Sequence, residues 1–551
     1  MIDMPGAKVQ VSSYAELNFL EKFLTLFTRV RPGEGIAVAV LFSHGFLVMG
    51  CYYLLRPLRE ALILSDGSAE LRSYAAAFQA VALLLVMPLY SWLFRRRGNM
   101  LMIQWVNVFF VFNLALFAIA GITGFRFNFL FFIWVGLFNV MVIAQFWAFA
   151  ADLFNVKAGQ RLFAVIAVGC SLGAIAGARL SGLLLEPFGP YGVMLIACVV
   201  LASTLIISTI APKVIPQDSR SIASNKDEGE KLKSWLGGFQ VVFNSHYLMA
   251  IAALVVLLNW LMSNGDYILN QFVQSEVMSV LGENASVDER ALWMGEFFSN
   301  FYSLLNIGVF FIQLFLVSRL FLWAGVHVAI LILPVVLSGG FLLIGLLPLF
   351  ALSQLVLGTQ KALDYSLMNT TRNALFLTAT KSEKYEGKTT IDTFFVRFGD
   401  VFSAVAIFIV VSAGLGASSF IGLNILLSIV LFAIAWYIGH QYRSQASSES
   451  FNSAPQVFRE IPDAHWVGDG PFLHKIPADA FIDTDAGDVL EVKLTGLDMA
   501  LPSWLRFDKK TQILHCAKPP VFAVDVSVVA VVRDFDGLEA SSMFIVRRLL
   551  N

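Results

Sequence analysis

The chain has 551 residues, of which 58% are hydrophobic and 14% are charged, and its mean hydropathy is +0.73. A soluble domain contains about 25% charged residues, so this composition excludes an ordinary globular fold. The net charge of −1 provides no overall field that would favour binding to nucleic acid. The apolar residues fall into repeated runs of about 20, the length at which a helix crosses a bilayer. We therefore expect an all-α polytopic membrane protein.

The first 34 residues contain no apolar stretch followed by small residues, so they do not resemble a cleavable signal peptide. Apolar side chains recur there at helical spacing, with charged residues between them. These are Leu17, Leu20, Phe23, Leu24 and Phe27. The pattern predicts a cytoplasmic amphipathic segment over residues 1–34 that lies on the membrane surface.

Twelve apolar segments follow, and we expect each to span the membrane. They cover residues 37–58, 72–94, 101–122, 127–150, 161–185, 190–211, 247–272, 292–318, 323–346, 349–370, 390–414 and 417–440. The longest connection, residues 212–246, is charged and contains SRSIASNKDEGEK, a composition typical of flexible linkers. It separates one six-helix half, residues 35–211, from a second, residues 247–440. Two six-helix halves are typical of the major facilitator fold.

Basic residues in the short loops predict the orientation of the spans. With the N-terminus inside, the cytoplasmic loops contain most of the lysines and arginines, whereas the opposite loops contain little beyond Arg72, Arg126 and Arg290. We expect a bacterial inner-membrane protein whose N-terminus and C-terminal domain are cytoplasmic.

The character of the chain changes after the last span. Residues 441–460 form a polar linker, and residues 461–551 contain short alternating strands such as DVLEVKLTG and VSVVAVVRD between Asp, Gly and Pro turns. About 90 residues is the size of one β-domain, so we expect a small all-β sandwich.

Charged residues inside spans are costly, and they usually line a cavity or pair with one another. Arg56, Arg59 and Glu60 interrupt the apolar run of the first span. Arg56 and Glu60 are four residues apart and could pair on one helix face. The alternative is that these side chains extend to the interface.

Three further charges lie in or at the end of spans. Asp152 ends the fourth span, as a gate residue or as a cap of the following turn. Arg179 lies within VGCSLGAIAGARLSG, whose small-residue spacing predicts close helix packing, and it is a candidate for anion contact. Asp266 lies in the polar stretch NWLMSNGDYILNQF, as a coupling residue or as half of an interhelix ion pair.

The segment 359–400 contains the most charges within an apolar context. Lys361 and Asp364 could pair within one turn, and the ring of Tyr365 could stack on a base. The cationic candidates for anion binding there are Lys361, Arg372, Lys388 and Arg397, and the candidate coupling or gate residues are Asp392 and Asp400.

No phosphate-binding loop GxxxxGK[ST], nucleophile elbow, HExxH or CxxC motif occurs in the sequence. We therefore expect a protein that is not an enzyme and that has neither a cofactor nor a metal site.

Several segments resemble the ATP/ADP carrier family, the nucleotide exchangers of plastids and intracellular bacteria, and especially its free-living bacterial relatives. They are FTRVRPGEG, YYLLRPLREALIL, FWAFAADLFNVKAGQRLFAVIAVGCSLGAIAG and DYSLMNTTRNALFLTATKSEKYEGKTTIDTFFVRFGD. The resemblance extends to about residue 440 and implies a major facilitator fold, nucleotide exchange, and functional roles for Arg59, Asp266 and Arg372. The sequence departs from the family pattern at three positions, where Arg59 replaces a lysine, Asn373 replaces a glutamate, and Val135 occupies an acidic position.

The tail resembles cadherin-like, immunoglobulin-fold modules of the dystroglycan type, through LPSWLRFDKKTQILHCAKPP and VVAVVRDFDGLEASSMFIV. Its acidic segments DTDAGD and RDFDG could bind Ca²⁺ or form plain turns. Such modules are usually extracytoplasmic, whereas twelve spans predict a cytoplasmic location for this one.

The interior charges predict a secondary transporter that moves an anionic solute, with ATP/ADP exchange as the specific form that the resemblance implies. Two alternative functions are also compatible with the sequence. One is proton-coupled transport of another organic anion, and the other is a non-transporting scaffold or sensor whose C-terminal domain binds a protein partner.

Overall fold

The computed structural model describes residues 18–25, 28, 30–31, 33–96, 99–216, 235–380, 382–415, 417–449, 455–467, 472–483, 490–497, 501–509, 511–516, 525–534 and 538–549. The chain divides into two compact units, a helical unit, Met1–Tyr442, and a β unit, Arg443–Asn551. All of the predicted linker sequence SRSIASNKDEGEK, residues 484–488 of the first acidic segment and residues 535–537 of the second lie outside the described residues.

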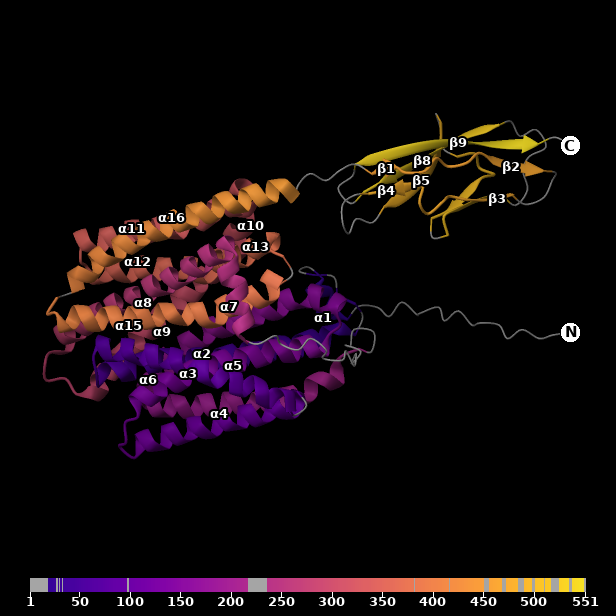
Figure 1. Ribbon diagram of the computed structural model, residues 1–551. Helices are drawn as coiled ribbons and strands as arrows, with labels where there is room; N and C mark the ends of the chain where they lie inside the picture. The colour runs from indigo at the N-terminus through magenta and orange to yellow at the C-terminus, as the bar shows by residue number, and fades with distance from the viewer. Residues whose placement is uncertain are drawn as a thin grey trace. The chain divides into compact units, whose positions relative to one another are not determined.

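The helical unit is a bundle of long helices that run side by side, with the first-half helices grouped below the second-half helices in Figure 1. The first half comprises α1 (Phe19–Leu24), α2 (Glu34–Ser65), α3 (Ala69–Arg96), α4 (Asn99–Ile122), α5 (Asn128–Leu153) and α6 (Val156–Val214). The second half comprises α7 (Trp235–Asn244), α8 (His246–Leu281), α9 (Val287–Phe311), η2 (Ile312–Leu316), α10 (Val317–Ala324), α11 (Val326–Leu346), α12 (Phe350–Leu363), η3 (Asp364–Met368), α13 (Asn369–Leu375), η4 (Phe376–Thr378), η5 (Glu383–Gly387), α14 (Lys388–Thr390), η6 (Ile391–Phe395), α15 (Val396–Ser412) and α16 (Ala417–Glu449).

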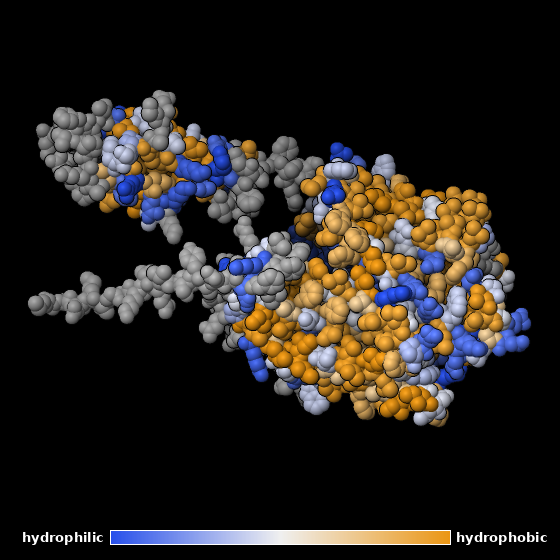
Figure 2. Space-filling view, turned by 180° about the vertical axis from the view of Figure 1, so that it is seen from behind, coloured by the Kyte–Doolittle hydropathy of each residue, from blue (hydrophilic) through white to orange (hydrophobic). Residues whose placement is uncertain are grey.

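The predicted fold class, with about twelve spans in two six-helix halves, is confirmed. In the described part of the chain, ten helical segments are long and apolar enough to cross a membrane. The longest, within α6, contains two spans, because Gly189 breaks the helix with a φ of 66°. The remaining predicted span is α12 with η3 and α13, which is too interrupted to count as one long helix. Hydrophobic residues cover most of the face of this unit shown in Figure 2.

A glycine stripe on α6 allows its close packing against α2. A methyl group at Gly169, Gly173 or Gly177 would overlap the α2 backbone carbonyls of Phe42, Phe46 and Gly50. Small residues of this spacing let two membrane helices approach closely. The stripe therefore places the charged end of α2 at a fixed depth in the bundle.

The helix that carries Lys361 changes its winding at the next charged position. Regular α12 ends at Leu363 and continues as the π-helical segment η3, from Asp364 to Met368, before α-helix resumes. π-Helical turns inside α-helices are rare and are frequent at functional sites.

The β unit is a sandwich of short strands around its own core. Its strands are β1 (Gln456–Val457), β2 (Ala464–Val467), β3 (Phe472–Lys475), β4 (Phe481–Ile482), β5 (Glu491–Gly496), β6 (Arg506–Asp508), β7 (Ile513–Cys516), β8 (Val526–Arg533) and β9 (Glu539–Leu549). One sheet has the order β2-β9-β8-β5 and a second has the order β3-β7-β6, with a small β1-β4 pair beside them. The two main sheets face each other across buried residues such as Leu514 and Phe544. This confirms the predicted all-β fold.

Candidate functional site

The charged residues of the first span are buried inside the helical unit. Arg56, Arg59 and Glu60 on α2 are only 8%, 8% and 1% exposed. The interpretation that these side chains extend to the membrane interface is therefore wrong. Their helix lies against α6 and against α9 of the second half, so the three charges lie where the two halves meet.

Five charged side chains form a continuous alternating chain across this boundary, which we call the ion chain: Arg59, Glu60, Arg72, Asp266 and Lys361. Arg59 donates to Glu60 Oε1 at 3.1 Å, and Arg72 donates to both oxygens of Glu60 at 2.8 and 3.2 Å. Arg72 also reaches Asp266 Oδ2 at 3.4 Å, and Lys361 Nζ lies 2.7 Å from Asp266 Oδ1. Each carboxylate thus has two cationic partners.

Arg72 is the member of the ion chain that the sequence interpretation missed, because it was assigned to an external loop. Helix α3 begins at Ala69, three residues earlier than predicted, and Arg72 is 6% exposed. It connects α2 and α3 of the first half to α8 of the second half. The available signal was that Arg72 follows Glu60 across a short turn, which brings the two helix ends together.

Asp266 forms the interhelix ion pair that was one of its two predicted roles, and it does so with both Arg72 and Lys361. The predicted pairing of Arg56 with Glu60 is wrong, because Glu60 is bound by Arg59 and Arg72. The predicted pairing of Lys361 with Asp364 is also absent, because Lys361 turns to Asp266 instead.

Arg56 lies beside the ion chain in a cage of four tyrosines. Its guanidinium donates at 3.0 Å to the hydroxyl of Tyr53 and at 3.0 Å to that of Tyr365. The guanidinium carbon lies 4.2 Å from the ring centre of Tyr302 and 5.8 Å from that of Tyr52. Within the described part of the chain, no carboxylate lies within 4.0 Å of Arg56, and its buried Nε has no hydrogen-bond partner.

An aromatic residue of α5, Phe132, packs against two arginines of the ion chain. The ring of Phe132 lies 4.5 Å from the guanidinium carbon of Arg59 and 5.3 Å from that of Arg72. Cations above an aromatic face are stabilised by its negative quadrupole, and more strongly where water is excluded. Arg59 also reaches the amide oxygen of Gln79 at 3.5 Å, close to Gly136 of α5.

The remaining predicted cations of the second half form local pairs away from the ion chain. Arg372 and Lys388 both bind Asp392, at 3.4 and 2.9 Å. Arg397 lies 3.6 Å from Asp400, which accepts a 2.7 Å hydrogen bond from Ser263.

Two predicted residues of the first half also lie apart from the ion chain. Arg179 is exposed on α6 and donates to the amide oxygen of Asn300 on α9. Asp152 is exposed near the end of α5, and the cap of the following helix is Asn155, whose side chain accepts from the Ala158 amide. The predicted capping role therefore belongs to Asn155.

Polar contacts between the halves close the end of the bundle that carries residues 66–68. Gln274 of α8 donates to the carbonyls of Leu64 and Gly67 at 3.2 and 3.0 Å, and it accepts from the Ala69 amide. Glu70 accepts from Tyr267 and Gln271 of α8 at 2.8 and 2.7 Å. The two halves are therefore held together by hydrogen bonds at this end.

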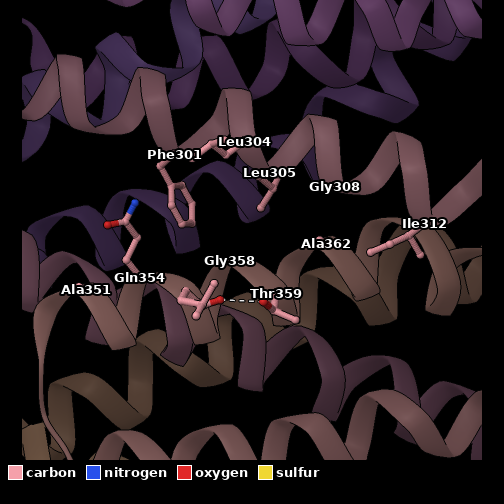
Figure 3. Close-up of a pocket in the computed structure, with 11 residues that line it drawn as sticks. Phe301, Leu304, Leu305, Gly308, Ile312, Ala351, Gln354, Gly358, Thr359 and Ala362 are labelled. Carbon is pink, nitrogen blue, oxygen red and sulfur yellow. Dashed lines mark hydrogen bonds between the residues drawn. The ribbon is translucent and has the colours of Figure 1, made fainter.

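A cavity of about 440 Å³ lies between α9 and α12. Figure 3 shows that it is lined mainly by apolar and small side chains, and that the hydroxyl of Thr359 is hydrogen-bonded within its own helix. Its rim residues Leu304 and Leu355 are 64% and 66% exposed, and none of the ion-chain residues line it. The cavity is therefore a feature of the outer surface of the bundle.

Metal binding has no support in the described residues, where no three His, Cys, Asp or Glu side chains are grouped to hold an ion. The acidic side chains of the ion chain already bind arginine and lysine. This arrangement is suited to holding an anion through Arg56 and Lys361, and no reactive group is placed for covalent chemistry among these residues.

Solved structures similar to this chain share its arrangement of helices. A POT family transporter in complex with 5-aminolevulinic acid matches with a TM-score of 0.53 and 15% identity, covering 74% of this chain and 96% of that one. The helical unit has the major facilitator fold. The nucleoside transporter NupG matches with a TM-score of 0.51 and 12% identity, covering 74% of this chain and 99% of that one. A bacterial homolog of the human lysosomal transporter Spinster matches with a TM-score of 0.50 and 13% identity, covering 76% and 99%.

No family model and no curated protein matches the sequence. The resemblances to the ATP/ADP carrier family and to cadherin-like modules are therefore not confirmed. At identities of 12% to 15%, the solved structures establish the major facilitator fold of the helical unit and nothing more specific.

Proposed function

We propose that this chain is a secondary transporter, not an enzyme, which moves an anionic solute by alternating access of its two halves. The observation that carries the proposal is Arg56, a buried cation at the boundary of the halves with no carboxylate partner in the described residues. Burying an unpaired charge costs several kcal/mol, so such a residue is retained where a ligand completes it.

The tyrosine cage supports this role, because it stabilises the empty site without neutralising it. Cation–π contacts contribute about 0.5–2 kcal/mol each, less than the cost of burying a charge. The phenol hydroxyls of Tyr53 and Tyr365 hold the guanidinium in place while Nε is left free to donate. An arriving carboxylate or phosphate would accept from Arg56 as a charge-assisted hydrogen-bond partner.

The ion chain supports alternating access because it links moving parts. Arg72 of the first half holds Asp266 of the second half by one 3.4 Å contact, whereas it holds Glu60 of its own half by two shorter ones. Rocking the halves apart at this end would break the weaker contact first, leaving Asp266 with Lys361 and Glu60 with both Arg59 and Arg72. Glu60 and Asp266 would then each keep at least one cationic partner during the transition.

ATP/ADP exchange is the specific form of the proposal that the sequence resemblance favours, with Tyr365 beside the anion site as the ring on which a base would stack. Proton-coupled transport of another organic anion is the second form. It is favoured by Asp400, a spanning carboxylate that accepts a hydrogen bond from Ser263 and lies 3.6 Å from Arg397. We further propose, from the distribution of basic residues in the loops, that the N-terminus and the β unit are cytoplasmic in a bacterial inner membrane, where the β unit would bind a protein partner.

Uptake into proteoliposomes tests the proposal. Labelled ADP, AMP and succinate would be supplied outside vesicles that contain the same unlabelled anion, and uptake would be compared with that of empty vesicles. We expect uptake of at least one of these anions by the wild type and its loss in Arg56→Gln. Arg179→Gln is the matched control, because it removes an exposed arginine of the same half outside the ion chain. No anion uptake by the wild type, with normal folding, would favour a scaffold or sensor.

A further inference from the structure

The charges at the boundary of the halves do not balance. The ion chain alternates from Arg59 through Glu60, Arg72 and Asp266 to Lys361, so it begins and ends on a cation. Arg56 adds a further cation with no carboxylate of its own. Four cations against two carboxylates leave an excess of two positive charges in the cluster formed by the ion chain and Arg56.

Nearby carboxylates do not remove this excess. Asp400 is paired with Arg397, so that pair is neutral in itself. Asp364 and Glu70 are half-buried and lie within 4.0 Å of none of the cluster cations in the described part of the chain. Glu70 accepts hydrogen bonds from neutral groups, among them Tyr267 and Gln271.

We propose that the solute carries two negative charges and is bound as a bridge between Arg56 of the first half and Lys361 of the second. This inference rests on the proposed transport function, and at the same site it selects a dianion in place of the more highly charged ADP and ATP of the exchange form. A compact dicarboxylate and a phosphate monoester share the required chemistry, since each presents two negative charges to two cationic donors.

Arg56 and Lys361 are the ends of the bridge because each has fewer than two carboxylate partners in the described residues and both interact with the same two tyrosines. Tyr302 and Tyr365 interact electrostatically with Arg56 and with Lys361. Arg56 has no carboxylate contact, and Lys361 has one, whereas Arg72 has two. The two cations come from α2 and α12, so an anion between them joins the halves.

Charge matching follows from the low dielectric of the site. Uncompensated charges interact far more strongly there than in water, so the bound complex is most stable when the excess is cancelled. A monoanion leaves one positive charge unbalanced, and a trianion adds a negative one. Affinity should therefore pass through a maximum at two negative charges.

Two ligand series separate charge from molecular shape. One is butyrate, succinate and tricarballylate, and the other is AMP, ADP and ATP. Dissociation constants would be measured with the purified full chain at pH 7.5. We expect succinate to bind at least about tenfold more tightly than either relative, and AMP at least about tenfold more tightly than ADP or ATP.

Variants that change the excess charge provide the decisive comparison. Asp266→Asn raises the excess by one and should move the preference towards tricarballylate. Lys361→Gln and Arg56→Gln each lower it by one, at opposite ends of the bridge, and both should move it towards butyrate. Arg126→Gln removes a cation from an exposed pair outside the cluster and should leave the preference unchanged.

The outcomes distinguish this inference from the proposed function. A preference that ignores charge number, or that is the same in the variants and the wild type, would overturn the dianion bridge and leave anion transport standing. A wild type that neither binds nor transports any member of the two series would overturn both.

Discussion

Replacing Arg72 with glutamine should destabilise the helical unit, because Arg72 is the only member of the ion chain that contacts both of its carboxylates. Arg72 makes three contacts to carboxylates, at 2.8, 3.2 and 3.4 Å, and Glu60, which accepts two of them, is 1% exposed. Removing one partner of a buried ion pair costs about 3–5 kcal/mol. Glu60 keeps Arg59 and Asp266 keeps Lys361 in the variant, so we expect a loss at the lower end, about 3 kcal/mol.

Reversible unfolding of the purified protein in mixed micelles measures this loss. A double-mutant cycle with Glu60→Gln should show a coupling energy of about 1–3 kcal/mol, because each single variant already loses the direct Arg72–Glu60 contact and the double variant loses it only once. Arg126→Gln is the control, since it breaks the Arg126–Asp288 contact between the halves at an exposed position, where pairs contribute about 1 kcal/mol or less. A loss below about 1 kcal/mol for Arg72→Gln, or strict additivity with Glu60→Gln, would refute the buried ion chain.

Three further predictions concern other parts of the chain. Gly173→Ala should cost about 1–3 kcal/mol in the same unfolding assay, because its methyl group meets the backbone of α2; an unchanged stability would contradict the close packing. A cavity lined by His44, Asn107 and Gln145, whose buried polar atoms lack partners, should contain one ordered water in a high-resolution density map, and a dry cavity would contradict this. Burial lowers the pKa of His474 in the β unit, so the unfolded chain takes up a proton first and stability should fall as the pH drops below about 6.5. Hydrogen exchange of β8 at pH 5.5 and 7.5, corrected for intrinsic rates, should show this loss in the wild type and not in His474→Phe.

The bilayer-crossing pattern was predictable from sequence because it depends on local composition. Runs of about 20 apolar residues, a charged connection in the middle and basic residues in alternate loops are all local features, and the twelve spans follow from them. The two predicted spans within α6 are present, and they are joined by a kink at Gly189 in place of the predicted loop. The π-helical turn at Asp364 has no sequence signature of this kind.

The members of the charged site were predictable in part, and their pairing was not. Arg56, Arg59, Glu60, Asp266 and Lys361 stand out as charges within apolar runs. Which of them pair depends on the rotation and depth of four different helices, which local spacing does not encode. Spacing along one helix suggested Arg56 with Glu60 and Lys361 with Asp364, whereas Glu60 binds Arg59 of its own helix and Arg72 of α3, and Lys361 binds Asp266 of α8.

Arg72 belongs to the charged site, but its sequence position does not reveal this. A charge within a few residues of a predicted span boundary is assigned to the loop by any rule based on hydropathy, and span boundaries are the least certain part of such a prediction. Only the packing of α3 against α2 and α8 shows that the side chain points inward. Arg179 stood out in the sequence as strongly as Arg56, yet it lies exposed on α6.

A structure of the protein with its bound anion tests the central claim most directly. The tightest ligand of the two charge series would be added, and a map that resolves side chains would be calculated. We expect density for the anion within hydrogen-bond distance of both Arg56 Nε and Lys361 Nζ, with Tyr302 and Tyr365 against it. Density for the anion elsewhere, with Arg56 still enclosed by its tyrosines, would overturn the anion bridge.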